Sequence, residues 1–281
     1  MEDVDLGGSG GVKVVIFCGG LGVRMGEETQ RIPKPMIEIG GKPILWHIMR
    51  YYSMWGHKEF ILALGYKSEV VKQYFLSYNG ALFNDFVLGH RAGETTLEML
   101  SRDLDEWQIT FVDTGLTTTI GGRLSAVAPH LGDDETFLAT YGDGLTDAPL
   151  DDMVRTFDAS GKTGMFLSVH TPFNAHLVYA DDYGVVTGVH EMASADIRMN
   201  GGFFVFKRDV IDLIGPGEEL VNEPFARLIE RQELLAYRYD GFFLPMDTIK
   251  DRQVLESLND SGDAPWRRPP GVEVDAGPVT G

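Results

Sequence analysis

The stretch FCGGLGVRMGEETQRIPKPMIEIGG, residues 17–41, decides the fold prediction. A run of aliphatic residues from Val12 to Phe17 leads into it, and this pattern predicts a buried strand that ends in glycines. Gly19, Gly20 and Gly22 let the backbone approach a ligand closely and turn its N–H groups toward an anion. The start of the chain therefore predicts a strand followed by an anion-binding glycine loop.

Two cations in the same stretch suit phosphate groups. Arg24 supplies a planar, permanently charged fork that matches phosphate oxygens. Lys34 supplies a point charge, and the prolines at 33 and 35 restrict its backbone. Together with the glycines, these residues predict that the segment binds a triphosphate.

Other glycine-loop chemistries fit the sequence poorly. A dinucleotide fingerprint needs a third glycine where Met25 stands, and an acidic residue where the next strand, 59–64, runs into Gly65. The G-x-x-x-x-G-K-[ST] pattern of a P-loop is absent. A simple tight turn after the strand remains the structural alternative.

The order of the motifs resembles that of the sugar nucleotidyltransferases, and most closely that of the bacterial glucose-1-phosphate cytidylyltransferase family. The loop GGLGVR (19–24), then PKPM (33–36) and GGKP (40–43) follow one another as in that family. The resemblance extends from Val12 to Trp266. Further matching stretches are GKPILWHIM (41–49), GYK (65–67), VDTG (112–115), GGRL (121–124), TYGDG (140–144), NGGFFV (200–205) and PMDT (245–248).

Alternating strand and helix patterns predict an α/β fold. The resemblance implies a Rossmann-like nucleotidyltransferase fold, with a mainly parallel central sheet flanked by helices and a small β-hairpin that serves the acceptor. A hairpin is expected at 177–189, and an irregular excursion or hairpin at 79–108. In such a sheet, ligands bind outside the carboxyl ends of the strands, where the glycine loop, Asp113 and Asp143 fall. Strands are expected at 59–64, 109–113, 136–141, 164–170, 203–206, 234–239 and 242–244, and helices at 43–55, 68–78, 122–128, 150–160, 208–214, 222–233 and 248–258.

The domain organisation is expected to be simple. No linker or internal repeat divides the chain, so we expect one domain at 12–264. The acidic, glycine-rich residues 1–11 are expected to form a flexible leader, unlike a signal peptide. The proline- and glycine-rich residues 265–281 are expected to be a disordered tail.

Composition narrows the partners. The 281-residue chain has a net charge of −18 without a compensating basic stripe, which argues against nucleic acid. It has no apolar run of bilayer-spanning length, so no membrane is expected. Its single cysteine suits a reducing cytoplasm, and Cys18 at the end of the first strand is interpreted as a small buried hydrophobe.

Two aspartates are candidate ligands for Mg²⁺, which takes one or two carboxylates together with substrate phosphates. Asp143 lies between two glycines after a strand, and its alternative is an aspartate in an ordinary turn. Asp247 precedes the last helix, and its alternative is the N-cap of that helix. The resemblance implies that this pair holds Mg²⁺ between nucleotide and sugar phosphate.

The resemblance also implies the nucleotide site. Arg24, Lys34 and Asp143 are the expected catalytic residues, and Arg123 is expected to contact base or phosphate unless it is an exposed helix arginine. Tyr66 and Lys67 fit a cleft or the surface equally well. The full set expected to contact nucleotide is Gly19, Gly20, Leu21, Gly22, Val23, Arg24, Lys34, Tyr66, Gly121, Gly122, Arg123 and Asp143.

The acceptor side departs from the family pattern. Glu191 keeps the glutamate of the family's EKP motif, but Met192 replaces its lysine, which removes a charge-assisted contact worth roughly 1.5–3 kcal/mol. His176 stands where the family has a small residue, and Val23 replaces the loop threonine. Arg198, His190 or His176 could replace the lost charge, or the acceptor differs from glucose 1-phosphate. Acceptor-binding residues are expected to be Glu191, Asn200, Gly201, His176 and Arg198.

The residues and the resemblance together predict a Mg²⁺-dependent nucleotidyltransferase, and the resemblance alone implies that it joins CTP and a sugar 1-phosphate, giving a CDP-linked product and pyrophosphate. Family resemblance further implies a homo-oligomer. Two alternatives stay open, namely a uridylyl- or thymidylyltransferase and a homologue that binds nucleotide without turnover.

Overall fold

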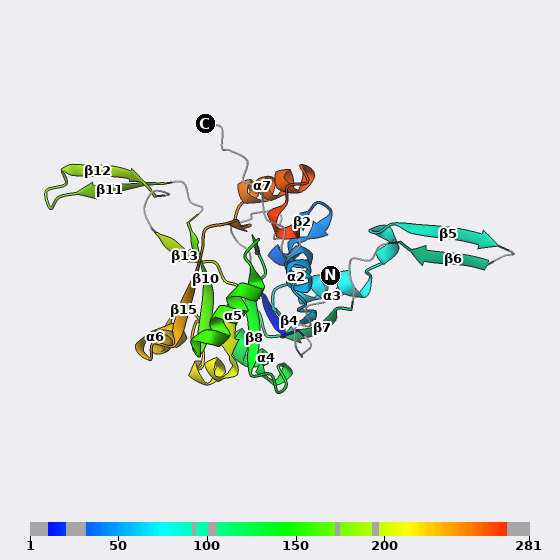
Figure 1. Ribbon diagram of the computed structural model, residues 1–281, viewed down its shortest axis with the longest axis horizontal. Coiled ribbons are helices and arrows are strands. Elements are labelled where there is room, and N and C mark those ends of the chain that lie inside the picture. The colour runs from blue at the N-terminus through cyan, green and yellow to red at the C-terminus, as the bar shows by residue number, and fades with distance from the viewer. Residues whose placement is uncertain are drawn as a thin grey trace, which may run out of the picture.

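A central sheet of eight strands organises the molecule in the computed structural model, which describes residues 11–20, 32–91, 94–100, 106–171, 175–192 and 197–268 (Figure 1). The strand order is β13-β10-β14-β8-β1-β4-β7, and β15 pairs with β10. The neighbours β8, β1, β4 and β7 run parallel, whereas β14 and β13 are antiparallel to their partners. The strands are β1 (Val14–Cys18), β4 (Glu59–Leu64), β7 (Gln108–Asp113), β8 (Thr136–Tyr141), β10 (Gly164–His170), β13 (Arg198–Asn200), β14 (Phe204–Lys207) and β15 (Leu234–Tyr239).

Helices cover both faces of this sheet (Figure 1). The α-helices are α2 (Ile44–Met54), α3 (Ser68–Leu76), α4 (Ile120–Val127), α5 (Leu150–Ser160), α6 (Glu223–Glu230) and α7 (Ile249–Asp260). The 3₁₀ segments are η2 (Lys34–Met36), η3 (Gly80–Leu82), η4 (Ala128–His130), η6 (Arg208–Leu213) and η7 (Pro265–Arg267). None of the helices in these described ranges has the length and apolar character to cross a membrane.

Alternation along the strands produces two cores. In β1, Val14 and Ile16 pack into one hydrophobic cluster, whereas Val15 and Phe17 pack into the other. This follows from the period of two in a strand, which sends successive side chains to opposite faces. Both faces of β1 are fully buried, as expected of a central parallel strand. Helices α2, α3, α5 and α7 supply the first core, and α4 and α6 supply the second.

Four small two-stranded ribbons complete the fold. They are β2 (Glu38–Ile39) with β3 (Lys42–Pro43), β5 (Phe86–Arg91) with β6 (Glu94–Met99), β9 (Gly144–Thr146) with β16 (Phe243–Pro245), and β11 (His176–Ala180) with β12 (Val186–Glu191). The β5–β6 and β11–β12 hairpins project from opposite sides of the body (Figure 1).

The mainly parallel sheet flanked by helices confirms the expected fold class. The expected hairpin at 177–189 is β11–β12, and the unassigned stretch 79–108 contains β5–β6. Residues 208–214, expected as a helix, form only the 3₁₀ segment η6.

The expectation of a disordered tail from Pro265 is wrong for its first residues. Pro265–Arg267 forms η7, and the side chain of Trp266 is 1% exposed. The indole packs against His47 and Phe242, so burial of one large aromatic ring fixes this segment to the body. The expected leader up to residue 10 and the rest of the tail from 269 lie outside the described residues.

Candidate active site

Three charged side chains from distant parts of the chain meet beside the carboxyl end of β8. Lys34 Nζ lies 2.7 Å from Asp143 Oδ2 and 2.6 Å from Asp247 Oδ1. The Lys34 side chain is 12% exposed, and the two carboxylate side chains are 29% and 25% exposed. The structure therefore brings together the expected catalytic lysine and both expected metal ligands.

A short antiparallel ribbon places the two aspartates side by side. In the β9–β16 pair, Gly144 lies opposite Pro245, and the N–H of Met246 donates to the carbonyl of Asp143 over 2.8 Å. Asp143 and Asp247 thus leave this ribbon at the same end. Their convergence depends on strand pairing between segments a hundred positions apart.

Close packing of a glycine positions the lysine. Lys34 opens η2, and Pro35 follows it. A Cβ at Gly142 would lie 3.1 Å from Pro35 Cγ and 3.0 Å from the Phe17 carbonyl oxygen, tighter than ordinary contact. Glycine at 142 therefore lets the proline segment approach the end of β8, and this approach carries Lys34 to Asp143.

The two carboxylates keep the lysine charged. Burial by itself would lower the pKa of the Lys34 ammonium, but Asp143 and Asp247 together hold that pKa above its ordinary value. With both aspartates ionised, the cluster carries one net negative charge. Such a cluster attracts a further cation.

The donor set fits Mg²⁺. Asp143 and Asp247 are hard oxygen donors that already converge on one cationic group, the Lys34 ammonium. No group of three or more His, Cys, Asp or Glu side chains suited to a metal occurs among the described residues. Two carboxylates with substrate phosphates completing the shell is the usual arrangement for Mg²⁺, which binds few protein ligands.

The alternative interpretation of Asp247 as an N-cap is wrong. Thr248 is the N-cap of α7, because its hydroxyl accepts from the N–H of Asp251 and the Asp251 carboxylate accepts from the N–H of Thr248. This reciprocal pair is a capping box. The side chain of Asp247 is directed at Lys34 instead.

Arg123 is buried, contrary to the alternative of an exposed helix arginine. Its side chain lies against Gly19, and the residue is 2% exposed. Its two terminal nitrogens donate to the carbonyls of Gly19, Leu64 and Leu116 and to the hydroxyl of Thr114, over 2.6–3.3 Å. The guanidinium therefore ties together the carboxyl ends of β1, β4 and β7.

Glycines make room for this guanidinium. A Cβ at Gly19 would lie 2.0 Å from Arg123 Cζ, and one at Gly65 would lie 2.7 Å from Arg123 Nη1. Gly19 is thus required by packing in this structure, whereas Gly20 is exposed and no atom of the described residues lies within 4 Å of a Cβ placed there. The other expected loop contacts, Leu21, Gly22, Val23 and Arg24, lie outside the described residues.

The remaining nucleotide-side residues surround the same strand ends. Gly121 and Gly122 lie in the first turn of α4, where the Gly122 N–H donates to the Thr119 hydroxyl and Gly121 packs on the carbonyl of Glu218. Tyr66 is half-buried after β4, and the ammonium of Lys67 lies 5.4 Å from its ring centre.

Asn200 and Gly201 lie beside the charged cluster. The Asn200 side chain accepts from the N–H of Gly202 over 2.9 Å and hydrogen-bonds Tyr141, two residues before Asp143. Burial, followed by the nearby Glu219 and Asp143 charges, raises the pKa of Tyr141 to about 12. A Cβ at Gly201 would lie 3.2 Å from the ring of Phe243 in β16. This turn therefore packs on the ribbon that carries the aspartates.

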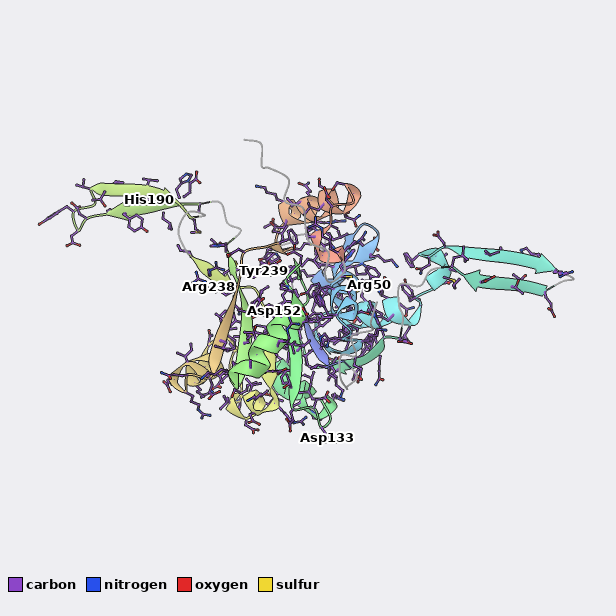
Figure 2. The ribbon with its side chains drawn as sticks, in the orientation of Figure 1. Arg50, Asp133, Asp152, His190, Arg238 and Tyr239 are labelled. Carbon is purple, nitrogen blue, oxygen red and sulfur yellow. The ribbon has the colours of Figure 1, made fainter. Side chains whose placement is uncertain are left out.

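The other acceptor candidates lie on the β11–β12 hairpin. His176 and Glu191 are cross-strand partners, both exposed, and the Met192 N–H continues the ladder to the carbonyl of Ala175. Figure 2 shows His190 on this hairpin, well away from the body. Among the described residues, Lys34 forms its hydrogen bonds with Asp143 and Asp247 and with neither His176 nor Glu191.

Arg198 has a role within the sheet. Its guanidinium donates to the carbonyls of Ser168 and Tyr239 and pairs with the carboxylate of Asp240. This joins β13, β10 and the end of β15 (Tyr239 is labelled in Figure 2). A phosphate at this guanidinium would have to compete with these protein partners.

Two features escaped the sequence interpretation. Asp251 accepts three hydrogen bonds around Asp247, and its signal was present as the Thr248-x-x-Asp251 spacing of a capping box. A cavity of about 750 Å³ lies against the same segment as Lys34 but is lined by residues such as Met36, Tyr74 and Arg252. No local sequence pattern predicts this cavity, because its walls come from three separate parts of the chain, namely α3, α7 and residues 32–43.

Comparison with known proteins identifies relatives along nearly the whole chain. The nucleotidyl transferase family model matches residues 13–237. The glucose-1-phosphate cytidylyltransferase of Salmonella typhi is 44% identical over 260 residues, which cover 91% of this chain and 99% of the relative. A Bacillus subtilis protein named "Probable glucose-1-phosphate cytidylyltransferase" is 38% identical over 258 residues, with coverage of 91% and 99%.

Solved structures share the fold at low sequence identity. The UTP-bound UGPase from Acinetobacter baumannii superposes with a TM-score of 0.65 at 16% identity, covering 89% of this chain and 93% of that one. At this identity the match concerns the architecture of the sheet and its helices.

Proposed function

Because this chain belongs to the nucleotidyl transferase family, we propose that it transfers a cytidylyl group from CTP to a sugar 1-phosphate and releases pyrophosphate. The observation that carries this proposal is the convergence of Lys34, Asp143 and Asp247. One cation and two carboxylates lie beside the end of β8, whose neighbour β1 runs into Gly19 and Gly20, and this setting suits a reaction whose reactants are all anions. Glucose 1-phosphate is the acceptor named for the Salmonella relative.

The reaction needs alignment more than proton transfer. A phosphate oxygen of the acceptor attacks the α-phosphorus of CTP, a new P–O bond forms, and the bond to pyrophosphate breaks. The attacking oxygen is already ionised at neutral pH, so the barrier lies in bringing anions together. Lys34 supplies positive charge at the meeting point, and its raised pKa keeps that charge in place.

Asp143 and Asp247 would hold Mg²⁺ in this proposal. When bound, Mg²⁺ supplies charge neutralisation for the phosphates. The two carboxylates are held by the β9–β16 ribbon, and Lys34 by the proline segment packed on Gly142. Preorganised charge of this kind favours the transition state, because no reorganisation is needed during the reaction.

The nucleobase is proposed from the relatives, whereas the acceptor is proposed from the relatives and from this chain's own residues. Cytosine is proposed from the two cytidylyltransferase relatives, and uracil or thymine remains the alternative. Glucose 1-phosphate is the default acceptor, while Met192 and His176 favour a changed acceptor preference. Asn200 and Gly201 are the acceptor candidates that pack beside the charged cluster.

We further propose that the chain works as a homo-oligomer. Both projecting hairpins expose apolar side chains, which favour contact with a second copy. Examples are Val178, Tyr179 and Val189 on β11–β12 and Val87, Leu88 and Leu97 on β5–β6, all between 49% and 61% exposed. The measured mass in solution tests this, and a monomer at working concentration would contradict it.

The first experiment is pyrophosphate release with CTP, UTP, dTTP, GTP and ATP, each against a panel of phosphorylated acceptors. Efficient turnover of CTP with glucose 1-phosphate would support the full proposal and reject a changed acceptor. Turnover of CTP only with another sugar phosphate would support the changed pocket. A chain that CTP and Mg²⁺ stabilise thermally, without pyrophosphate release from any pair, would be a nucleotide binder instead.

A further inference from the structure

The Asp251 carboxylate gathers three hydrogen bonds at the start of α7. Its Oδ2 atom accepts from the N–H of Asp247 over 3.1 Å, from the N–H of Thr248 over 2.7 Å and from the Thr248 hydroxyl over 2.8 Å. The second contact is one half of the capping box, whose other half is the Asp251 N–H donating to the Thr248 hydroxyl. The first reaches one residue further, to the backbone of the expected metal ligand.

These contacts complete the support of the Asp247 backbone. The preceding residue, Met246, donates its N–H to the Asp143 carbonyl, and Asp247 donates its own to Asp251. The Thr248 N–H, which belongs to the next peptide group, also donates to Asp251, so Asp251 holds the peptide groups on both sides of the Asp247 Cα. Fixing the backbone here restricts where the Asp247 carboxylate can go, because only two side-chain torsions remain.

The helix itself is anchored near Lys34. Glu256 accepts from the N–H of Gly40 over 2.9 Å, and a Cβ at Gly40 would lie 2.2 Å from Asn259 Nδ2. Gly40 lies in the turn between β2 and β3, shortly after η2. Helix α7 thus contacts the Lys34 segment through its second half and holds Asp247 at its first turn.

Asp251 and Asp247 have different roles at the N-terminus of α7. The N-terminus of α7 favours a negative charge, and Asp251 supplies it within the first turn. Because Asp251 and Thr248 satisfy the N–H groups there, the carboxylate of Asp247 is not needed as a cap. It contacts Lys34 across the site instead.

We infer that Asp251 is a positioning residue for the catalytic centre: its carboxylate sets the Asp247 backbone so that the Asp247 carboxylate meets Lys34 and Asp143 around one cation. This inference rests on the proposed function for its catalytic consequence, though not for its geometric one. Loss of a group that orients a metal ligand typically lowers metal affinity or activity by about 10–100-fold.

The test compares Asp251→Ala with Thr248→Ala and Asp251→Asn. Thr248→Ala removes the N-cap hydroxyl but leaves Asp251 to hold the Asp247 N–H, so it controls for loss of helix stability. Asp251→Asn keeps an acceptor oxygen and is the conservative rescue. The readouts are the melting temperature, kcat and KM for pyrophosphate release with CTP and glucose 1-phosphate, and Mn²⁺ binding to the nucleotide-free protein followed by the free-ion EPR signal.

The expected result separates the variants. Asp251→Ala should weaken Mn²⁺ binding and lower kcat by about 10–100-fold, with little change in KM for CTP. Thr248→Ala should lower the melting temperature about as much as Asp251→Ala does, but its Mn²⁺ affinity and kcat should stay near those of wild type. Asp251→Asn should retain most of the wild-type Mn²⁺ affinity and most of the wild-type kcat.

Three outcomes bear on the inference directly. Equal kcat and equal Mn²⁺ affinity in Asp251→Ala and Thr248→Ala would overturn it, as would a wild-type protein that binds no Mn²⁺. A wild type that turns over no CTP but loses Mn²⁺ affinity on Asp251→Ala would support the inference and reject the proposed function.

Discussion

Lys34 and Asp143 stand 109 positions apart in the chain, yet their Nζ and Oδ2 atoms lie 2.7 Å apart. Asp247, which lies 213 positions after Lys34, contacts the same ammonium. The contact places a permanent positive charge between the two carboxylates that the proposed reaction would use for its metal ion.

Removing this charge should impair the reaction. We expect Lys34→Met to lower kcat for pyrophosphate release by about 10²–10³-fold, the usual effect of losing one group that stabilises developing charge. Steady-state kinetics with CTP and glucose 1-phosphate measure this. Lys207→Met is the matched control, since Lys207 is a half-buried lysine that donates to the Gly161 carbonyl. Equal activity of the two variants would remove Lys34 from the mechanism.

Asp143→Asn should abolish most turnover while the fold persists. The amide keeps the size of the side chain but loses the negative charge that pairs with Lys34 and would bind Mg²⁺. Activity titrated against Mg²⁺, with circular dichroism as the check on folding, measures the effect. Wild-type turnover at saturating Mg²⁺ would mean that Asp143 has no part in the chemistry.

Arg123→Lys should destabilise the protein. Lysine cannot reproduce the fork that bonds Gly19, Leu64 and Thr114, and a buried acceptor left unsatisfied costs about 1–3 kcal/mol. Urea unfolding should show this loss, whereas Arg155→Lys on the exposed face of α5 should not. A normal unfolding free energy combined with a raised KM for CTP would instead favour direct contact of Arg123 with nucleotide.

Acid should destabilise the fold through His47. Its Nε2–H donates to the Ile39 carbonyl and its Nδ1 accepts from Trp266, so the buried ring is held neutral. Burial lowers the pKa of His47 from 6.5 to about 4. Because the folded pKa is depressed, the stabilisation is complete above pH 6.5 and is lost as pH falls toward 4, by about 3 kcal/mol at most.

The pH dependence of the unfolding free energy measures this effect. The unfolding free energy of wild type should exceed that of His47→Gln above pH 6.5, and this difference should shrink as the pH falls to 4. The unfolding free energy of His190→Gln, a change at an exposed histidine, should follow that of wild type at every pH. A difference between wild type and His47→Gln that stays constant with pH would contradict the assignment.

Truncating Trp266 should remove a large part of the free energy of unfolding. The indole is 1% exposed and packs on His47 and Phe242, so Trp266→Ala should cost about 3–5 kcal/mol. Thermal or urea unfolding measures it, with the exposed Tyr183→Ala as control. A near-zero change would mean that η7 does not hold the end of the domain.

Local patterns were sufficient for much of the fold. Strands β4, β8, β10 and β15 and helix α5 have the bounds that their apolar periodicity predicts. The pattern failed where local and tertiary preferences differ: residues 208–214 look helical but form a 3₁₀ segment, and Trp266 lies in a proline-rich stretch whose composition suggests disorder.

The sequence by itself determined the class of the protein and the charged residues available to it. Motif order and apolar periodicity are local properties of the chain, so they can be recognised without knowledge of the tertiary contacts. Only the tertiary structure decided how those charged residues are used. Arg123 became a buried tie, Asp251 rather than Asp247 joined the helix cap, and Glu191 went to a projecting hairpin. These outcomes depend on pairing and packing between distant segments, such as β9 with β16, and no local pattern encodes such contacts.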